Sequence, residues 1–239
     1  MKTMNTIRKA GGLLLGAALM AGCSERNAQT GPTGPASGPF SADVAAGKTS
    51  VVIDIPGAED KAAQAYEDIV SASITKKGGT FVVVMDLAAQ VPDNPPLPSS
   101  ADMLDWVVAI DKDPTSPAGY DFTKNTAAIW EFVIEHRMYR SGFTDPLDPK
   151  SSAGILVDRR PLLTGGQAIV TPIQFSMEGT KLTWVVDAAL LGDPATFQWA
   201  DATLGASAGD DVKNGYNNIS ILDQAPNVNQ GAPRATWPQ

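Results

Sequence analysis

The loop at residues 111–121 carries the side chains best suited to binding a metal ion. Asp111, Asp113 and Asp121 supply three carboxylates, and Thr115 adds a hydroxyl. Hard oxygen ligands of this kind are those that Ca²⁺ prefers. The spacing is not that of an EF-hand, because no Gly lies at the required turn position and no Glu closes the loop. We therefore predict a calcium site at these three aspartates. The alternative is an acidic turn whose carboxylates accept hydrogen bonds from the backbone.

A second acidic group lies around residues 54–68. Asp54, Glu59, Asp60 and Asp68 could add a further cation site. The alternative is a solvated face whose carboxylates lie near a helix N-terminus, where the helix dipole favours them.

His136 is the only histidine of the chain, which restricts redox and catalytic hypotheses. Haem ligation would need a second axial ligand such as Met85, Met103 or Met177, and nothing in the sequence fixes one. The alternative is a hydrogen-bonded core histidine. Catalysis by a Ser-His or Cys-His arrangement would also have to use this imidazole, and no carboxylate pair is marked by its context. We therefore predict that the protein is not an enzyme, and we rank haem below calcium as a cofactor.

Four residues fit a sugar-binding role, since such sites combine exposed aromatic faces with planar polar groups. Tyr139 is accompanied by Arg137 and Arg140, and Tyr120 lies beside the acidic loop. We predict these four as ligand-binding residues. The alternative is that the two tyrosines are scattered surface aromatics.

The N-terminus has the pattern of a bacterial export signal. Positive residues up to Lys9 precede an apolar stretch of 12 residues, Gly11–Gly22, which is shorter than the about 20 residues of a membrane-spanning helix. Met20-Ala-Gly-Cys23 then resembles a lipobox, which implies cleavage before Cys23 and acylation of this residue. Ser24 follows the cysteine, and in Gram-negative lipoproteins the absence of Asp there usually permits sorting to the outer membrane.

Composition limits what the protein can bind. The 239 residues include 18 Lys and Arg against 26 Asp and Glu, so the formal net charge is −8. Removing residues 1–22 removes three basic and no acidic residues, which leaves −11. This balance argues against a nucleic-acid partner, which would need a basic surface. It also argues against electrostatic docking on anionic lipid, so we expect the lipid on Cys23 to hold the protein on the membrane.

The body of the chain has the period of two that is typical of half-buried strands. Gly-containing turns at Gly78-Gly79 and at Gly179 each lie between two alternating segments and predict hairpins. Only Glu59–Ile69 has helical spacing. About nine or ten strands with one short helix predict an all-β fold, an antiparallel β-sandwich of jelly-roll type. The strands are expected at 49–55, 70–75, 81–87, 104–110, 128–140, 154–159, 173–177, 182–186, 197–204 and 219–222.

Four segments follow from these patterns. We predict a signal peptide at 1–22, a lipidated flexible tether at 23–47, a β-sandwich domain at 48–228 and a Pro-rich tail at 229–239 that includes Trp237. The other tryptophans alternate with apolar residues and are expected in the core: Trp106, Trp130, Trp184 and Trp199.

Seven strand and turn segments form a recognisable set: Asp68–Ile74, Phe81–Leu87, Trp106–Asp113, Phe175–Gly179, Val185–Gly192, Phe197–Trp199 and Asp223–Asn227. Together they resemble the DOMON-like and family-nine carbohydrate-binding-like β-sandwiches of secreted bacterial proteins. The resemblance implies a jelly-roll-like sandwich that binds sugars or haem, or that serves as an accessory domain.

The expected function is that of a cell-envelope lipoprotein on the bacterial outer membrane, with a non-catalytic domain that binds a glycan. The first alternative is a structural or protein-interaction subunit of an envelope complex. The second is a haem-binding electron carrier.

Overall fold

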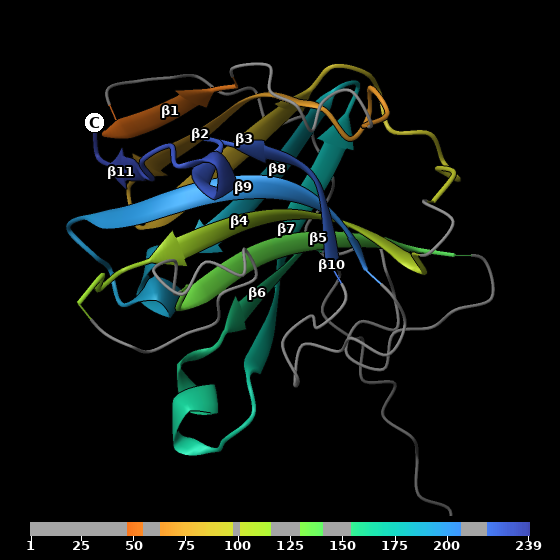
Figure 1. The fold of residues 1–239 in the computed structure, drawn as a ribbon. Helices are drawn as coiled ribbons and strands as arrows, with labels where there is room; N and C mark the ends of the chain where they lie inside the picture. The colour runs from red at the N-terminus through yellow and green to blue at the C-terminus, as the bar shows by residue number, and fades with distance from the viewer. Residues whose placement is uncertain (1–46, 55–62, 98–100, 116–129, 141–153, 207–218) are drawn as a thin grey trace, which may run out of the picture. The chain divides into compact units, whose positions relative to one another are not determined.

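A computed structural model describes residues 47–54, 63–97, 101–115, 130–140, 154–206 and 219–239 (Figure 1). These residues form eleven strands and three short 3₁₀ helices, η2 (Arg160–Thr164), η3 (Ala188–Leu191) and η4 (Val228–Gln230), and the described part of the chain contains no α-helix. The predicted all-β class is confirmed. The strands are β1 (Thr49–Ile53), β2 (Ile69–Lys77), β3 (Thr80–Leu87), β4 (Met103–Asp111), β5 (Phe132–Tyr139), β6 (Gly154–Asp158), β7 (Ile169–Glu178), β8 (Lys181–Asp187), β9 (Phe197–Ala206), β10 (Ile219–Ala225) and β11 (Ala235–Trp237).

The strands form one antiparallel sheet in the order β1-β2-β3-β8-β7-β6-β5-β4-β9-β10, and β11 pairs with β9. Both predicted hairpins are present, as β2–β3 and β7–β8. Gly78 and Gly179 in their turns have φ of +60°, a conformation that glycine adopts without strain. The antiparallel sandwich expected from the alternating pattern is therefore confirmed.

The two ends of this sheet approach each other, so that the sheet nearly closes. At one point Ser50 Oγ in β1 donates to the carbonyl oxygen of Thr236 in β11 at 2.9 Å. At another, the N–H of Ile69 in β2 donates to Asp223 Oδ2 in β10 at 2.5 Å. We call this line of contact between β1–β2 and β9–β11 the seam.

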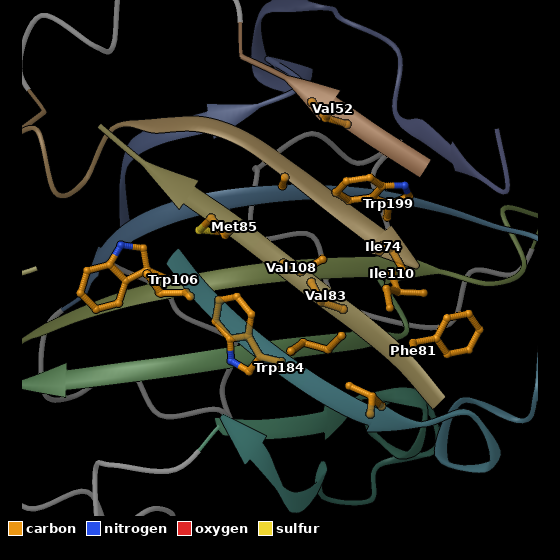
Figure 2. Close-up of a cluster of buried hydrophobic side chains, with 14 of the residues drawn as sticks. Val52, Ile74, Phe81, Val83, Met85, Trp106, Val108, Ile110, Trp184 and Trp199 are labelled. Carbon is orange, nitrogen blue, oxygen red and sulfur yellow. The ribbon is translucent and has the colours of Figure 1, made fainter. Parts of the chain in front are cut away.

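Strand β4 is buried along its whole length because both of its faces carry core residues. Trp106 and Val108 belong to a main core cluster (Figure 2). Val107 and Ala109 belong to a second core cluster on the opposite face. The main core cluster also includes Phe81, Val83, Met85, Ile134, Trp184 and Trp199. The second core cluster includes Met103, Trp130, Val133, Ile155, Val157, Ala200, Ala202 and Leu204.

The tryptophan prediction is confirmed, since Trp106, Trp130, Trp184 and Trp199 are all buried. Trp130 and Phe132 are two residues apart, but they belong to different core clusters. Strand β5 begins only at Phe132, so the strict alternation does not reach back to Trp130.

Two predicted segments differ from the structure. No helix forms over the described part of Glu59–Ile69: the N–H groups of Glu67 and Asp68 both bond to the Gln64 carbonyl in a turn, and Ile69 already belongs to β2. At the other end, Ala235–Trp237 forms β11 where a Pro-rich tail was expected, because pairing with β9 and burial of Trp237 order it.

The predicted signal peptide, Cys23 and the tether up to residue 46 lie outside the described residues. In the part of the chain that the structure does describe, no helix has the length and apolar character needed to span a membrane.

Candidate functional site

A cavity of about 290 Å³ lies beside the C-terminal end of β5. It is formed by the end of this strand and by the segment that connects β3 to β4. The lining residues are Asp93, Asn94, Pro95, Leu97, Met138, Tyr139 and Arg140.

Residues of β4 and the segment before it hold the β5 side of this cavity in place. Tyr139 lies opposite Met103 in the β4–β5 ladder, and its ring packs partly against the second core cluster. Arg140 follows β5. Its N–H donates to the Asp102 carbonyl at 2.8 Å, and its guanidinium donates to the Ala101 carbonyl and lies 3.6 Å from Asp102 Oδ1. The Arg140 side chain remains 51% exposed, so it is positioned without being enclosed.

The opposite wall of the cavity is a segment rich in proline. Pro95 and Pro96 restrict the backbone, because each proline ring fixes φ. Tyr66 Oη donates to the Pro96 carbonyl at 2.8 Å, and Val91 is buried in the main core cluster. The wall is therefore fixed to the core at two points.

The cavity offers two kinds of surface. Leu97, Met138 and the Tyr139 ring are apolar, whereas the Asp93 carboxylate accepts hydrogen bonds and the Arg140 guanidinium donates them. The Asn94 amide can do both. The cavity volume is close to the lower limit of about 300 Å³ for ligand pockets, so the cavity suits a small ligand. Its two kinds of surface suit a ligand that has an apolar face and several hydroxyl groups.

Of the four predicted ligand-binding residues, the structure brings Tyr139 and Arg140 together in this cavity. Tyr120 lies outside the described residues. Arg137 does not line the cavity, since its buried guanidinium is bound to Glu135. Asp93 and Asn94 were not identified from the sequence. They lie in a loop, where no periodicity marks a side chain as inward or outward.

Arg137 belongs to a buried charge network with Glu135, Asp105 and Arg159. Its Nε donates to Glu135 Oε2 at 2.7 Å and lies 3.7 Å from Asp105 Oδ2. Arg159 Nη2 lies 3.6 Å from Glu135 Oε1. Burial, followed by the charge of Glu135, holds the pKa of Asp105 well above its usual range, although Arg137 and Arg159 oppose this shift. The guanidinium of Arg137 compensates buried carboxylates.

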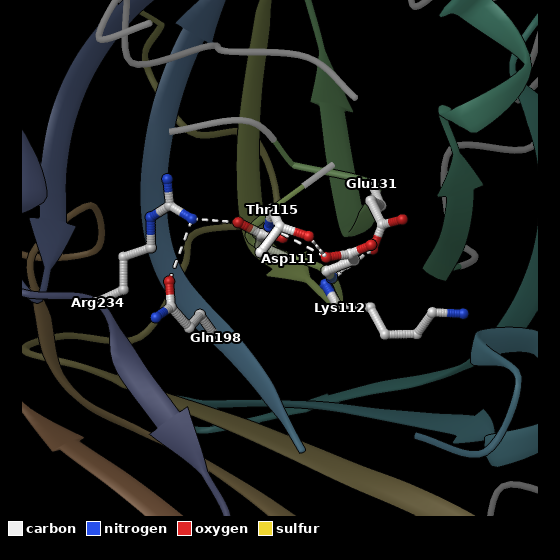
Figure 3. Close-up of polar contacts among 7 residues, drawn as sticks. Asp111, Lys112, Thr115, Glu131, Gln198 and Arg234 are labelled. Atoms are coloured by element: carbon white, nitrogen blue, oxygen red, sulfur yellow. Dashed lines mark hydrogen bonds and ion pairs between the residues drawn. The ribbon is translucent and has the colours of Figure 1, made fainter. Parts of the chain in front are cut away.

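At the predicted calcium loop, the described carboxylates bond to protein groups (Figure 3). Asp111 Oδ2 accepts from Arg234, which also reaches Gln198 Oε1 at 3.3 Å. Asp113 Oδ1 accepts from the N–H and the hydroxyl of Thr115 at 3.0 and 2.6 Å. Burial raises the pKa of Asp111, and Arg234 offsets part of this shift.

These contacts match the alternative interpretation of the loop as an acidic turn, but its third aspartate, Asp121, lies outside the described residues. Among the residues that the structure describes, no three His, Cys, Asp or Glu side chains are placed to hold a metal ion together. The calcium site at this loop stays a prediction.

Arg234 is a partly buried residue at this loop that the sequence interpretation missed. Besides its contact with Asp111, its guanidinium lies 4.6 Å from the centre of the Trp130 ring. The segment that contains Arg234 was expected to be a tail. The one feature of the sequence that could have indicated an ordered segment is Arg234 three residues before Trp237.

His136 is buried, as expected for a core histidine. Its ring stacks on Phe175 at a centroid distance of 3.9 Å and on Trp106 at 6.0 Å. Met85 belongs to the main core cluster and Met103 to the second, while Met177 packs against the first. Haem ligation by His136 stays a prediction.

Residues 205–209 read Gly-Ala-Ser-Ala-Gly and match the Gly-x-Ser-x-Gly pattern of nucleophile elbows. In α/β-hydrolases the serine of this pattern lies on a sharp turn from a strand into a helix. Here Gly205 and Ala206 end β9 of an antiparallel sheet in an all-β fold, and Ser207 lies outside the described residues.

A comparison with models of known protein families finds no match to this chain, and no curated protein sequence matches it.

Proposed function

We propose that this protein is a non-catalytic binding module of the bacterial cell envelope, and that it binds a carbohydrate in the cavity beside Tyr139. The observation that carries this proposal is the composition of the cavity. One aromatic and several apolar side chains lie next to a carboxylate, an amide and a guanidinium. A sugar ring needs both surfaces, since its C–H face packs on apolar groups while its hydroxyls donate and accept hydrogen bonds.

The location in the envelope is supported by the N-terminal sequence. The apolar stretch Gly11–Gly22 and the lipobox-like Met20–Cys23 favour export and acylation of Cys23, and Ser24 favours the outer membrane. A lipid-anchored module with a small polar cavity is suited to retaining a glycan at the cell surface.

The proposal is tested by screening the full chain against a glycan array and measuring the affinity for each hit by titration calorimetry. Tyr139→Ala and Asp93→Asn are expected to weaken binding by about tenfold or more, equivalent to about 1.4 kcal/mol. Arg160→Ala is the matched control for Arg140→Ala, because both arginines are partly exposed and paired with an aspartate, but only Arg140 lines the cavity. Array hits whose affinity is unchanged by all three cavity variants would contradict this site.

A second candidate function is that of a protein-interaction subunit in an envelope complex. It is favoured by exposed apolar residues on β1 and β2. Ile53 is 72% exposed, and Val51 and Val70 are each 46% exposed. An array without hits, together with a stoichiometric partner in an envelope pull-down that Ile53→Ser abolishes, would support this function over glycan binding.

A further inference from the structure

Two carboxylates are buried inside the sandwich at the seam. Asp201 lies in the middle of β9 and Asp223 in β10, and both are fully buried. Asp201 pairs with Ala225, and Asp223 pairs with Thr203. Trp199 and Ala225 belong to the main core cluster, which places Asp201 on the interior face of the sheet. Diagonal neighbours on one face of an antiparallel pair lie about 7–8 Å apart, so the two carboxylates are neighbours.

The carboxylate of Asp201 and the hydroxyl of Thr203 are buried without a hydrogen-bond partner among the described residues. Within the described part of the chain, neither carboxylate oxygen of Asp201 makes a hydrogen bond of ordinary geometry, and the hydroxyl of Thr203 makes none either. Asp223 uses Oδ2 to accept the N–H of Ile69 at 2.5 Å. A buried carboxylate without a counter-charge is strongly unfavourable, and cations or protons are the usual remedies.

The charges around Asp201 add to this imbalance. Burial raises the pKa of Asp201 well above its usual range, and the nearby carboxylates of Asp223 and Asp54 raise it further. The N–H groups of Ala225 and of Asp201 itself offset only part of this shift. No Lys, Arg or His of the described residues forms an ion pair with Asp201, and the charged groups that shift its pKa are the carboxylates of Asp223 and Asp54.

We propose that a calcium ion binds at the seam, held by the carboxylates of Asp201 and Asp223 and by the hydroxyl of Thr203. All three ligands are hard oxygens, and Ca²⁺ completes a shell of about six to eight ligands with backbone carbonyl and water oxygens. A third carboxylate is therefore not needed to complete the ligand shell of the ion. Asp54, which directly follows β1, adds negative charge from the other side of the seam.

Calcium at this position would stabilise the closure of the sheet. Asp223 already bonds to the first residue of β2, and Asp201 lies in the strand that also pairs with β11. An ion held by β9 and β10 beside these contacts would neutralise the charge that opposes them. The site is separate from both the predicted calcium loop at Asp111 and the cavity at Tyr139.

The test is calcium binding to the full chain after treatment with a chelator, followed by titration calorimetry and by the Tm with and without calcium. A ligand that binds only the folded state raises the Tm. We expect calcium to bind at the seam and to raise the Tm by several degrees. Asp201→Asn and Thr203→Val are expected to weaken binding by more than about tenfold, since even outer-shell substitutions cost about 10–100-fold.

Three further readouts keep the test decisive. Terbium bound at the seam should be excited through Trp199, two residues from Asp201 on the same strand, and calcium should displace it. Asp201→Asn should be at least as stable as the wild type in chelator, because the substitution removes a buried negative charge. Asp113→Asn, in the predicted calcium loop, should leave the terbium signal excited through Trp199 unchanged, because this signal reports on the seam alone.

Two results would overturn the proposal. One is a Tm that calcium does not change while acidification raises it, since this indicates that a proton occupies the site. The other is calcium binding that survives Asp201→Asn and Thr203→Val but is lost in Asp113→Asn, since this assigns the ion to the loop at Asp111.

Discussion

At the scale of single residues, Arg137 and Arg140 show how position on a strand decides what an arginine does. They are three residues apart at the end of β5. Arg137 is 3% exposed and paired with buried carboxylates, whereas Arg140 is 51% exposed at the cavity. The sequence predicts both as ligand-binding residues because both lie close to Tyr139. No pattern near Tyr139 shows that the sheet face carrying Arg137 is buried.

This difference predicts unequal effects on stability. Arg137→Ala removes one partner of a buried ion pair and is expected to lower the free energy of unfolding by about 3–5 kcal/mol. Arg140→Ala removes a surface pair worth about 0–1 kcal/mol. Urea unfolding of the two variants beside the wild type measures both values. Equal, small losses would mean that the network around Glu135 does not depend on Arg137.

Asp105 predicts a dependence of stability on pH. Its pKa is raised first by burial and then by Glu135, so its contribution to stability is complete below the unfolded value of about 3.9 and is lost as the pH rises toward the folded value. Asp105→Asn stays neutral at every pH. The stability of this variant relative to the wild type is therefore expected to increase with pH, as measured by urea unfolding at a series of pH values.

Asp86 provides a control of the opposite sign. Burial would raise its pKa, but hydrogen bonds from Lys181 and Thr180 outweigh this and lower it. Its contribution to stability is present above the unfolded pKa and is lost as the pH falls through the folded pKa. Asp86→Asn should therefore lose stability relative to the wild type as the pH rises. Parallel pH profiles for Asp86→Asn and Asp105→Asn would contradict this assignment.

At the scale of elements, period-two alternation identifies most strands, because it directly reports one buried face. The hairpins β2–β3 and β7–β8 follow from it with their glycine turns. β11 does not, since a strand of three residues is too short to show a period. The helix expected at Glu59–Ile69 is wrong for a different reason. Its apolar residues Tyr66 and Ile69 have helical spacing, but a turn and the start of β2 bury them instead.

Trp237 gives β11 a measurable role. Its ring is 1% exposed, stacks on Phe197 at a centroid distance of 5.1 Å and meets the edge of Phe81 at 5.0 Å. Trp237→Ala would leave a large cavity in the main core cluster and is expected to cost about 3–5 kcal/mol of unfolding free energy. Calorimetry or urea unfolding measures this cost. A loss below about 1 kcal/mol would show that the C-terminal segment behaves as the tail first expected.

At the scale of the whole molecule, the features that the sequence does not reveal are contacts between distant residues. The bond between Ile69 and Asp223 joins residues 154 positions apart, and the cavity combines the Pro-rich segment before β4 with the end of β5. Individual ligand residues such as Tyr139 can be proposed from strand position. Their partners Asp93 and Asn94 come from the three-dimensional path of a loop, which single-sequence patterns do not encode.

The predicted acylation of Cys23 makes the proposed location of the whole molecule testable. After removal of residues 1–22 the chain has a net charge of −11, so electrostatic attraction to anionic lipid cannot replace the anchor. Each buried methylene contributes about 0.8 kcal/mol, and firm anchoring needs more than one acyl chain. Cys23→Ser should therefore abolish acylation and release the protein from the membrane fraction, while glycan binding and unfolding of the domain stay unchanged. Because Cys23 is the only cysteine, labelling with a radioactive fatty acid reports directly on this residue. A Cys23→Ser protein that is still labelled and sediments with membranes would show that another group holds the chain there.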